Sequence, residues 1–467
     1  MLFSSILFIF YFLPIVLAVY FLIPARFIRA RNGVLLLASL IFYSWGEPVY
    51  VFLMIYSAFF NYYLALCIHE EKKKGGTGRR NLAFAVIVDL FILSFFKYYG
   101  FLMGNINHLF GLHLHYTQLA LPIGISFYTF QAMSYIFDVY RGTTTVQKNP
   151  LRFALYLSLF PQLIAGPIVK YRDVAEQLDH RETTLEGFGY GASRFVFGLG
   201  KKVLLANAFG ALFKSVTALP DSKLSVVTAW LGALAYTLQI YFDFSGYSDM
   251  AIGLGRMFGF EFLENFRYPY ISQSVTEFWR RWHISLSSWF REYVYIPLGG
   301  NRVSVPRHLL NLLIVWGLTG LWHGASWNFV IWGLYYGVIL ILEKYLLRNR
   351  LEKLPAWARH LYTMVIVTIG WVFFSRDSLA SAWQTIGIMF GNGAFPFADG
   401  TTFYLLRTNL ILLILGIFLS SSRPIRAFRR RTEDQPIFGI ICLGGILLLS
   451  TASLIFSSYN PFLYFRF

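Results

Sequence analysis

The sequence predicts an all-α, polytopic integral membrane protein, and three observations support this. Hydrophobic residues make up 57% of the 467 residues and charged residues only 13%, whereas a soluble domain carries roughly 25% charged residues. Long apolar runs recur along the whole chain. Lys and Arg gather in the loops between these runs, as they do in the cytoplasmic loops of membrane proteins. We therefore expect a single membrane domain over residues 1–467.

Each apolar run that could cross a hydrocarbon core of roughly 30 Å predicts a transmembrane helix. We expect about 11–12 such helices, with the shorter ones covered by neighbouring protein. The candidate spans are residues 2–23, 34–45, 48–68, 82–103, 119–139, 203–219, 224–242, 309–322, 327–347, 360–375, 404–420 and 437–457.

The positions of Lys and Arg predict the orientation. Basic clusters follow the spans 2–23 and 48–68, and the loop 104–118 contains neither Lys nor Arg. If the basic loops face the cytoplasm, both termini lie outside it, and residues 151–168 enter and leave the membrane on the cytoplasmic side as a re-entrant segment. The net charge of +17 indicates contact with anionic lipids of the inner or plasma membrane and not with nucleic acid.

A polar motif, Tyr241-Phe-Asp-Phe-Ser-Gly-Tyr-Ser-Asp249, stands at the expected cytoplasmic end of the span 224–242. It places Asp243, Ser245 and Asp249 among aromatic residues. An ionisable group at membrane depth is energetically costly and is a functional candidate for that reason. A helix cap or turn, in which the carboxylates accept bonds from nearby backbone, explains the motif equally well.

Residues 276–295 predict an amphipathic helix that lies in the membrane interface. The aromatic and basic candidates in this stretch are Trp279, Arg280, Arg281 and Trp282. At helical spacing, His283 lies one turn beyond Trp279 and faces aromatic rings. A packed interfacial histidine and a functional one both remain open, with the packed one slightly favoured by the residues alone.

The sharpest signal is Leu321-Trp-His-Gly324, between the spans 309–322 and 327–347. His323 stands beside Trp322, and the amide of Asn328 follows close behind. An imidazole among apolar segments is costly unless it is hydrogen-bonded or used. This position therefore predicts a functional histidine.

At these residues the chain resembles the membrane-bound O-acyltransferase family, in the branch of alginate O-acetyltransferase and the D-alanyl transfer protein of teichoic acids. The matching motifs are Tyr241–Asp249, Phe278-Trp-Arg-Arg-Trp-His283, Tyr295-Ile-Pro-Leu-Gly-Gly-Asn301 and Leu321-Trp-His-Gly324. The resemblance implies transmembrane, re-entrant and interfacial helices around a central tunnel, with a catalytic core at about residues 236–335. It implies that His323 is the central catalytic histidine and His283 the second functional one.

The chemistry of an O-acyltransferase suits these residues. A hydroxyl that attacks a thioester needs a base with a near-neutral pKa, and we assign this role to His323. His283 positions the donor or holds His323 in the useful tautomer. Trp322, Asn328 or backbone N–H groups are the candidates for stabilising the oxyanion.

We expect acetyl-CoA, or another acyl thioester such as an acyl carrier protein, to be the donor at the cytoplasmic face. Arg280, Arg281 and the basic loops would attract its phosphates. No permanently bound cofactor is expected. No metal is expected either, because Cys67 and Cys442 lack metal-ligand spacing.

The chain ends Pro461-Phe-Leu-Tyr-Phe-Arg-Phe467. A similar ending in this branch is proposed to carry the acyl group onward, so the resemblance makes Tyr464 a candidate acyl relay. An interfacial aromatic anchor formed with Arg466 is equally open.

The acceptor implied by the resemblance is a hydroxyl of an extracytoplasmic cell-envelope polysaccharide, reached with an extracytoplasmic partner protein. Acylation of a lipid or lipid-linked sugar is the alternative within the same class. A transporter without covalent chemistry is disfavoured, because few charged residues lie within the spans.

Overall fold

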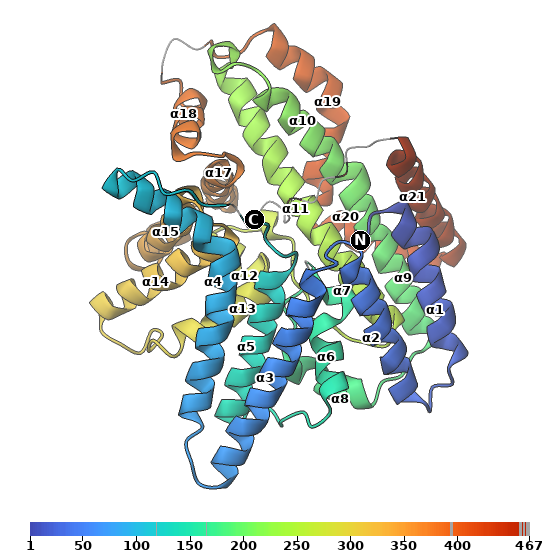
Figure 1. The fold of residues 1–467 in the computed structure, drawn as a ribbon. Helices are drawn as coiled ribbons and strands as arrows, with labels where there is room; N and C mark the ends of the chain where they lie inside the picture. Colours follow the sequence, from blue (N-terminus) through green and yellow to red (C-terminus); the bar gives the residue numbers. More distant parts are fainter. Residues whose placement is uncertain (118, 165, 393–395, 457–459, 461–462, 464–467) are drawn as a thin grey trace. The chain divides into compact units, whose positions relative to one another are not determined.

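The computed structural model describes residues 1–467 except 118, 165, 393–395, 457–459, 461–462 and 464–467 (Figure 1). All regular structure in the described residues is helical, which confirms the all-α prediction. Seven of these helices are long and apolar enough to cross a membrane. They are Tyr50–Lys73, Arg79–Phe110, Leu185–Thr217, Trp327–Lys353, Ala356–Ser375, Gly400–Leu419 and Pro436–Phe456. The chain is thus a multi-pass membrane protein, whereas the larger expected number of spans includes helices that are shorter or more polar.

Residue contacts group the chain into two compact units. The first comprises Met1–Phe195 and Ser248–Glu264, and the second Val196–Tyr247 and Asn265–Phe467. The expected single membrane domain stays a prediction. The first unit contains η1 (Phe8–Phe12), α1 (Leu13–Leu22), α2 (Ile28–Ser44), α3 (Tyr50–Lys73), α4 (Arg79–Phe110), α5 (Ile125–Arg141), α6 (Pro150–Ser158), α7 (Phe160–Leu163), α8 (Tyr171–Asp179) and most of α9 (Leu185–Gly200).

The segment expected to be re-entrant, 151–168, forms the two short helices α6 and α7. Leu159 leaves the helical conformation between them, and the backbone N–H of Phe160 donates to Ser39 Oγ at 3.0 Å. That bond satisfies a polar group which a helix break would otherwise leave buried without a partner. The break between the two helices is present, whereas the re-entrant path and its depth in the membrane stay predictions.

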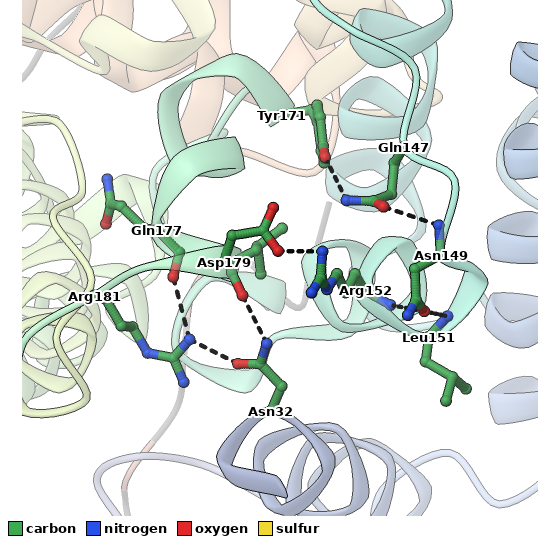
Figure 2. A network of polar contacts seen from close by, with 10 residues as sticks. Asn32, Gln147, Asn149, Leu151, Arg152, Tyr171, Gln177, Asp179 and Arg181 are labelled. Carbon is green, nitrogen blue, oxygen red and sulfur yellow. Dashed lines mark hydrogen bonds and ion pairs between the residues drawn. The ribbon is translucent and has the colours of Figure 1, made fainter. Parts of the chain in front are cut away.

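Polar contacts hold α8 and the residues after it against α2 and α6 (Figure 2). Asn32 Nδ2 donates to the Leu178 carbonyl at 2.8 Å, and Arg181 Nη1 donates to Asn32 Oδ1 at 2.6 Å. Arg152 forms an ion pair with Asp179. Although no helix was expected here, α8 is an ordered element of the first unit.

The second unit is built around α11 (Val226–Met257), whose last residues belong to the first unit. Its other elements are η2 (Lys201–Ala206), α10 (Asn207–Thr217), η3 (Asp221–Lys223), η4 (Pro269–Ile271), α12 (Val275–Arg281), α13 (Ile284–Phe290), η5 (Arg291–Tyr295), α14 (Val305–His323), α15 (Trp327–Leu342), η6 (Glu343–Leu347), α16 (Arg348–Lys353), α17 (Ala356–Ser375), α18 (Leu379–Met389), α19 (Gly400–Leu419), α20 (Ser422–Asp434) and α21 (Pro436–Phe456).

Two predicted helix boundaries are wrong. The helix expected over 276–295 breaks between α12 and α13, because His283 takes a left-handed backbone conformation, with φ of 45°. Conversely, α11 does not end at residue 242 but continues to Met257. Asp243 is therefore in the interior of a helix, and the helix-cap explanation does not hold for it.

Candidate active site

His323 is the last residue of α14, and its side chain is buried in an aromatic pocket. Its ring centroid lies 4.9 Å from that of Trp332 on α15 and 5.2 Å from that of Phe374 on α17. Two glycines, Gly320 and Gly333, allow this arrangement. A Cβ on Gly333 would lie 2.2 Å from the carbonyl oxygen of Trp316, so the backbones of α14 and α15 can approach this closely only with glycine there.

His283 is almost completely buried, with 1% of its surface exposed. It is one of two non-glycine residues with positive φ in the described chain, a strained conformation that persists only where the surroundings enforce it. The backbone N–H of the following residue, Ile284, donates to the Asn265 carbonyl at 3.0 Å. The segment before α12 thus holds the bend at His283 in place.

The side chain of Asn265 determines the tautomer of His283. Asn265 Oδ1 accepts from the Ser285 backbone N–H at 3.2 Å and from Ser285 Oγ at 2.9 Å. The same oxygen lies 3.1 Å from His283 Nδ1, which must therefore be the donor. This bonding pattern assigns the proton to Nδ1 and the basic lone pair to Nε2.

Trp322 connects the two histidines. Its ring centroid lies 5.0 Å from that of His323 and 5.9 Å from that of His283. The ring centroid of His283 also lies 4.7 Å from that of Phe244 on α11. The structure therefore brings both predicted histidines against one indole ring.

Burial lowers the pKa of the His283 imidazole to about 3. The bonded partner at Nδ1 is a neutral amide, which does not offset this desolvation. A neutral imidazole is therefore the stable form near pH 7. In that form it can orient a neighbouring group through Nε2 without carrying charge.

The tryptophans of the α12 motif extend the aromatic pocket. The ring centroid of Trp279 lies 5.6 Å from that of Trp332 and 4.8 Å from that of Tyr336. The ring centroid of Trp282 lies 4.8 Å from that of Trp371. These rings surround the histidines with apolar surface, which strengthens any electrostatic interaction formed inside the pocket.

Two of the polar residues predicted to contact substrate, Arg281 and Asn328, are bound to other groups of the protein. Arg281 forms an ion pair with Glu277 at 2.8 Å, while Arg280 is exposed. Asn328 Nδ2 donates to the Arg376 carbonyl at 2.5 Å. One N–H of the Asn328 amide therefore anchors the start of α15 to the end of α17.

The motif of α11 divides into different environments. Asp243 is buried and ion-paired with Lys202, and Ser245 is buried. Asp249 belongs to the first unit, where it pairs with Arg194 at 2.8 Å. Tyr464 lies outside the described residues.

Three contributors to the pocket were not singled out from the sequence, namely Trp332, Phe374 and Asn265. Trp332 and Phe374 reach His323 from other helices, and no local pattern marks them. Asn265 did carry a signal, because it opens the motif Asn265-Phe-Arg-Tyr-Pro-Tyr270 just before α12. Its bond to His283 spans 18 positions, which spacing alone does not reveal.

Comparison with known proteins decides the family. The family model of the membrane-bound O-acyltransferases matches residues 145–376, a range that includes both histidines. The chain is 41% identical to a probable alginate O-acetylase, AlgI, of Azotobacter vinelandii, in an alignment that covers all of both chains. The chain belongs to the membrane-bound O-acyltransferase family. It is an acyl-transferring enzyme, and a transporter without covalent chemistry is set aside.

Other relatives of this O-acyltransferase are named for different activities. A peptidoglycan O-acetyltransferase of Helicobacter pylori is 37% identical over 84% of this chain and 80% of its own. A teichoic acid D-alanyltransferase of Bacillus subtilis is 27% identical over 54% of this chain and 67% of its own. Both confirm the branch of the family that the motifs indicated.

Proposed function

We propose that this protein transfers an acetyl group from a cytoplasmic thioester to hydroxyls of a cell-envelope polysaccharide outside the membrane. The observation that carries the proposal is the pair of buried imidazoles against one indole, with His323 at the end of α14. The names of the alginate O-acetylase and peptidoglycan O-acetyltransferase relatives support acetyl as the acyl group and an envelope polysaccharide as the acceptor.

In the proposed reaction, the oxygen of the attacking hydroxyl forms a bond to the thioester carbonyl carbon. His323 takes the proton from that hydroxyl, the carbon–sulfur bond breaks, and the imidazolium returns the proton to the leaving thiolate. His283, held in one tautomer by Asn265, positions the reacting groups. The indole N–H of Trp322 is the candidate donor to the oxyanion, because its ring contacts both imidazoles.

The acyl group would pass through Tyr464 if the relay is correct. The phenol would be the first acceptor. The polysaccharide hydroxyl would then attack the carbonyl carbon of the tyrosyl ester with the help of an extracytoplasmic partner protein; the bond to the phenol oxygen breaks, and the proton of the hydroxyl restores the phenol. Replacing Tyr464 with Phe removes only the oxygen, so polymer acetylation should fall to background. Normal acetylation in this variant would leave the tail as an interfacial anchor.

A polar cavity of about 320 Å³ in the first unit is a candidate site for an anionic group. Arg181 and Arg256 line it together with Glu182 and Glu261, and Arg256 is ion-paired with Glu261. Arg181 Nη2 is a buried donor for which the described residues provide no acceptor, so an anionic oxygen there would satisfy it.

The experiment that tests the proposed function is O-acetylation of envelope polysaccharide in cells that depend on this protein. His323→Ala should reduce polymer acetate to background, and His308→Gln is the matched control. His308 is buried on the same helix and bonds to Tyr295 and Tyr345 at 2.8 Å, so it shares the helix but not the aromatic pocket. Acetate recovered in the lipid extract and absent from the polymer would replace the polysaccharide with a lipid acceptor.

A further inference from the structure

A buried ion pair in the second unit binds Leu463, which lies near the C-terminus. Lys202 Nζ lies 2.6 Å from Asp243 Oδ1, and each side chain is 2% exposed. The other carboxylate oxygen, Oδ2, accepts from the backbone N–H of Leu463 at 2.9 Å. Both oxygens of Asp243 therefore have assigned partners, and one of those partners is the tail.

A second contact reaches the same segment through the same lysine. Lys202 Nζ also donates to Asn207 Oδ1 at 3.0 Å. Asn207 Nδ2 in turn donates to Asn460 Oδ1 at 3.3 Å. The network thus contacts the tail at two residues, and Leu463 is itself buried.

The energetics of the pair argue for a specific role. A buried ion pair is often replaceable by apolar residues of similar volume without loss of stability, so stability alone does not explain it. Lys202 lies in the π-helical turn η2, a local widening that is frequent at functional sites. On α11, the residue after Asp243 is Phe244, whose ring contacts His283. The ion pair is therefore one residue along the helix from a contact of the candidate active site.

We propose that Lys202 and Asp243 are positioning residues that dock Asn460 and Leu463 of the chain's own C-terminal segment, and that acyl transfer through Tyr464 requires this docking. The docking stands on the contacts above. The purpose of the docking rests on the proposed function and its tyrosine relay.

Two double variants separate docking from folding. Lys202→Met with Asp243→Leu removes both charges and the acceptor for the Leu463 N–H. Lys202→Met with Asp243→Asn also removes both charges but keeps an amide oxygen that can accept that bond. Each avoids leaving a single buried charge, so both proteins should fold and elute as monodisperse species in detergent.

Digestion by a carboxypeptidase measures docking without reference to activity. We expect the variant with Lys202→Met and Asp243→Leu (the Leu double variant) to lose its C-terminal residues at least tenfold faster than the unmodified protein. The variant with Lys202→Met and Asp243→Asn (the Asn double variant) should be digested at close to the rate of the unmodified protein. Equal rates in the unmodified protein and in the folded Leu double variant would overturn the docking.

A change on the tail side keeps the core intact. Leu463→Pro removes the N–H donor, whereas Leu463→Val keeps both the donor and an apolar side chain. Leu463→Pro should be digested as fast as the Leu double variant, with no further acceleration when the two are combined, and Leu463→Val should stay protected. Equal digestion of the Pro and Val variants would also overturn the docking.

Polymer acetylation then tests the purpose. If docking serves the relay, acetylation should fall at least tenfold in the Leu double variant and in Leu463→Pro. Fast digestion with normal acetylation would retain the docking and refute the relay. Loss of acetylation with normal digestion would refute the docking and leave the proposed function standing.

Discussion

Removal of the Asn265 side chain tests how His283 is held. In the structure this one amide oxygen accepts from three donors, which are His283 Nδ1 at 3.1 Å, the Ser285 N–H at 3.2 Å and Ser285 Oγ at 2.9 Å. Asn265 is fully buried, and His283 and Ser285 are nearly so. Asn265→Ala therefore removes the acceptor of three buried donors at once.

The expected destabilisation follows from counting those donors. The Ser285 hydroxyl can rotate toward another acceptor, whereas the backbone N–H and the ring N–H are fixed in direction. Each buried donor without an acceptor costs about 1–3 kcal/mol, so two of them give about 2–6 kcal/mol. The left-handed conformation of His283 depends on these contacts, so transferase activity should fall as well, by at least tenfold.

The assay is reversible unfolding in mixed detergent micelles, combined with acetyl transfer measured on the folded fraction. Asn265→Asp is the matched variant, because it keeps the acceptor oxygens and should retain most of the stability. Its negative charge favours the imidazolium, so it should raise the pKa of His283 above its value in the unmodified protein. An Asn265→Ala protein with unchanged stability and full activity would refute the assigned tautomer.

Two further predictions concern helix packing and pH. Gly333→Ala should destabilise the protein by about 1–3 kcal/mol and reduce activity, because its Cβ would lie 2.2 Å from the Trp316 carbonyl oxygen. Gly444→Ala is the control, since nothing lies within 4 Å of its Cβ. Equal stability and activity of the two variants would contradict the close approach of α14 and α15. Acidification should unfold the protein through His283, because its pKa is lowered to about 3 in the folded state and the unfolded chain binds the proton first. The stability is therefore fully present above pH 6.5 and is lost as the pH falls toward 3, by about 2 kcal/mol between pH 7.5 and pH 5. His283→Gln should abolish this part of the pH dependence, and an unchanged slope in that variant would assign it to other groups.

The sequence predicted what depends on local pattern. Apolar runs located most of the helices, and the motif around His323 identified a histidine that the structure buries between Trp322, Trp332 and Phe374. The helix break at His283 was not predicted, because the aromatic residues around it keep a helical spacing and a positive φ leaves no trace in composition. What enforces that φ is Asn265, a contact made only after folding.

Asp243 shows the same limit from the other direction. Its neighbours in sequence left a functional carboxylate and a helix cap or turn equally open, yet α11 continues through the motif. The helix can bury this carboxylate because Lys202, on another helix, supplies the opposite charge. The partner of a buried charge is brought beside it only by the tertiary fold, so no local pattern in the sequence identifies it.

The most direct test of the central claim is release of coenzyme A by the purified protein from acetyl-labelled coenzyme A. In liposomes, the unmodified protein and His308→Gln should release free coenzyme A at comparable rates, and His323→Ala should release it at the rate of protein-free liposomes. Equal release by His323→Ala and the unmodified protein would contradict the assignment of His323 as the base of the transfer.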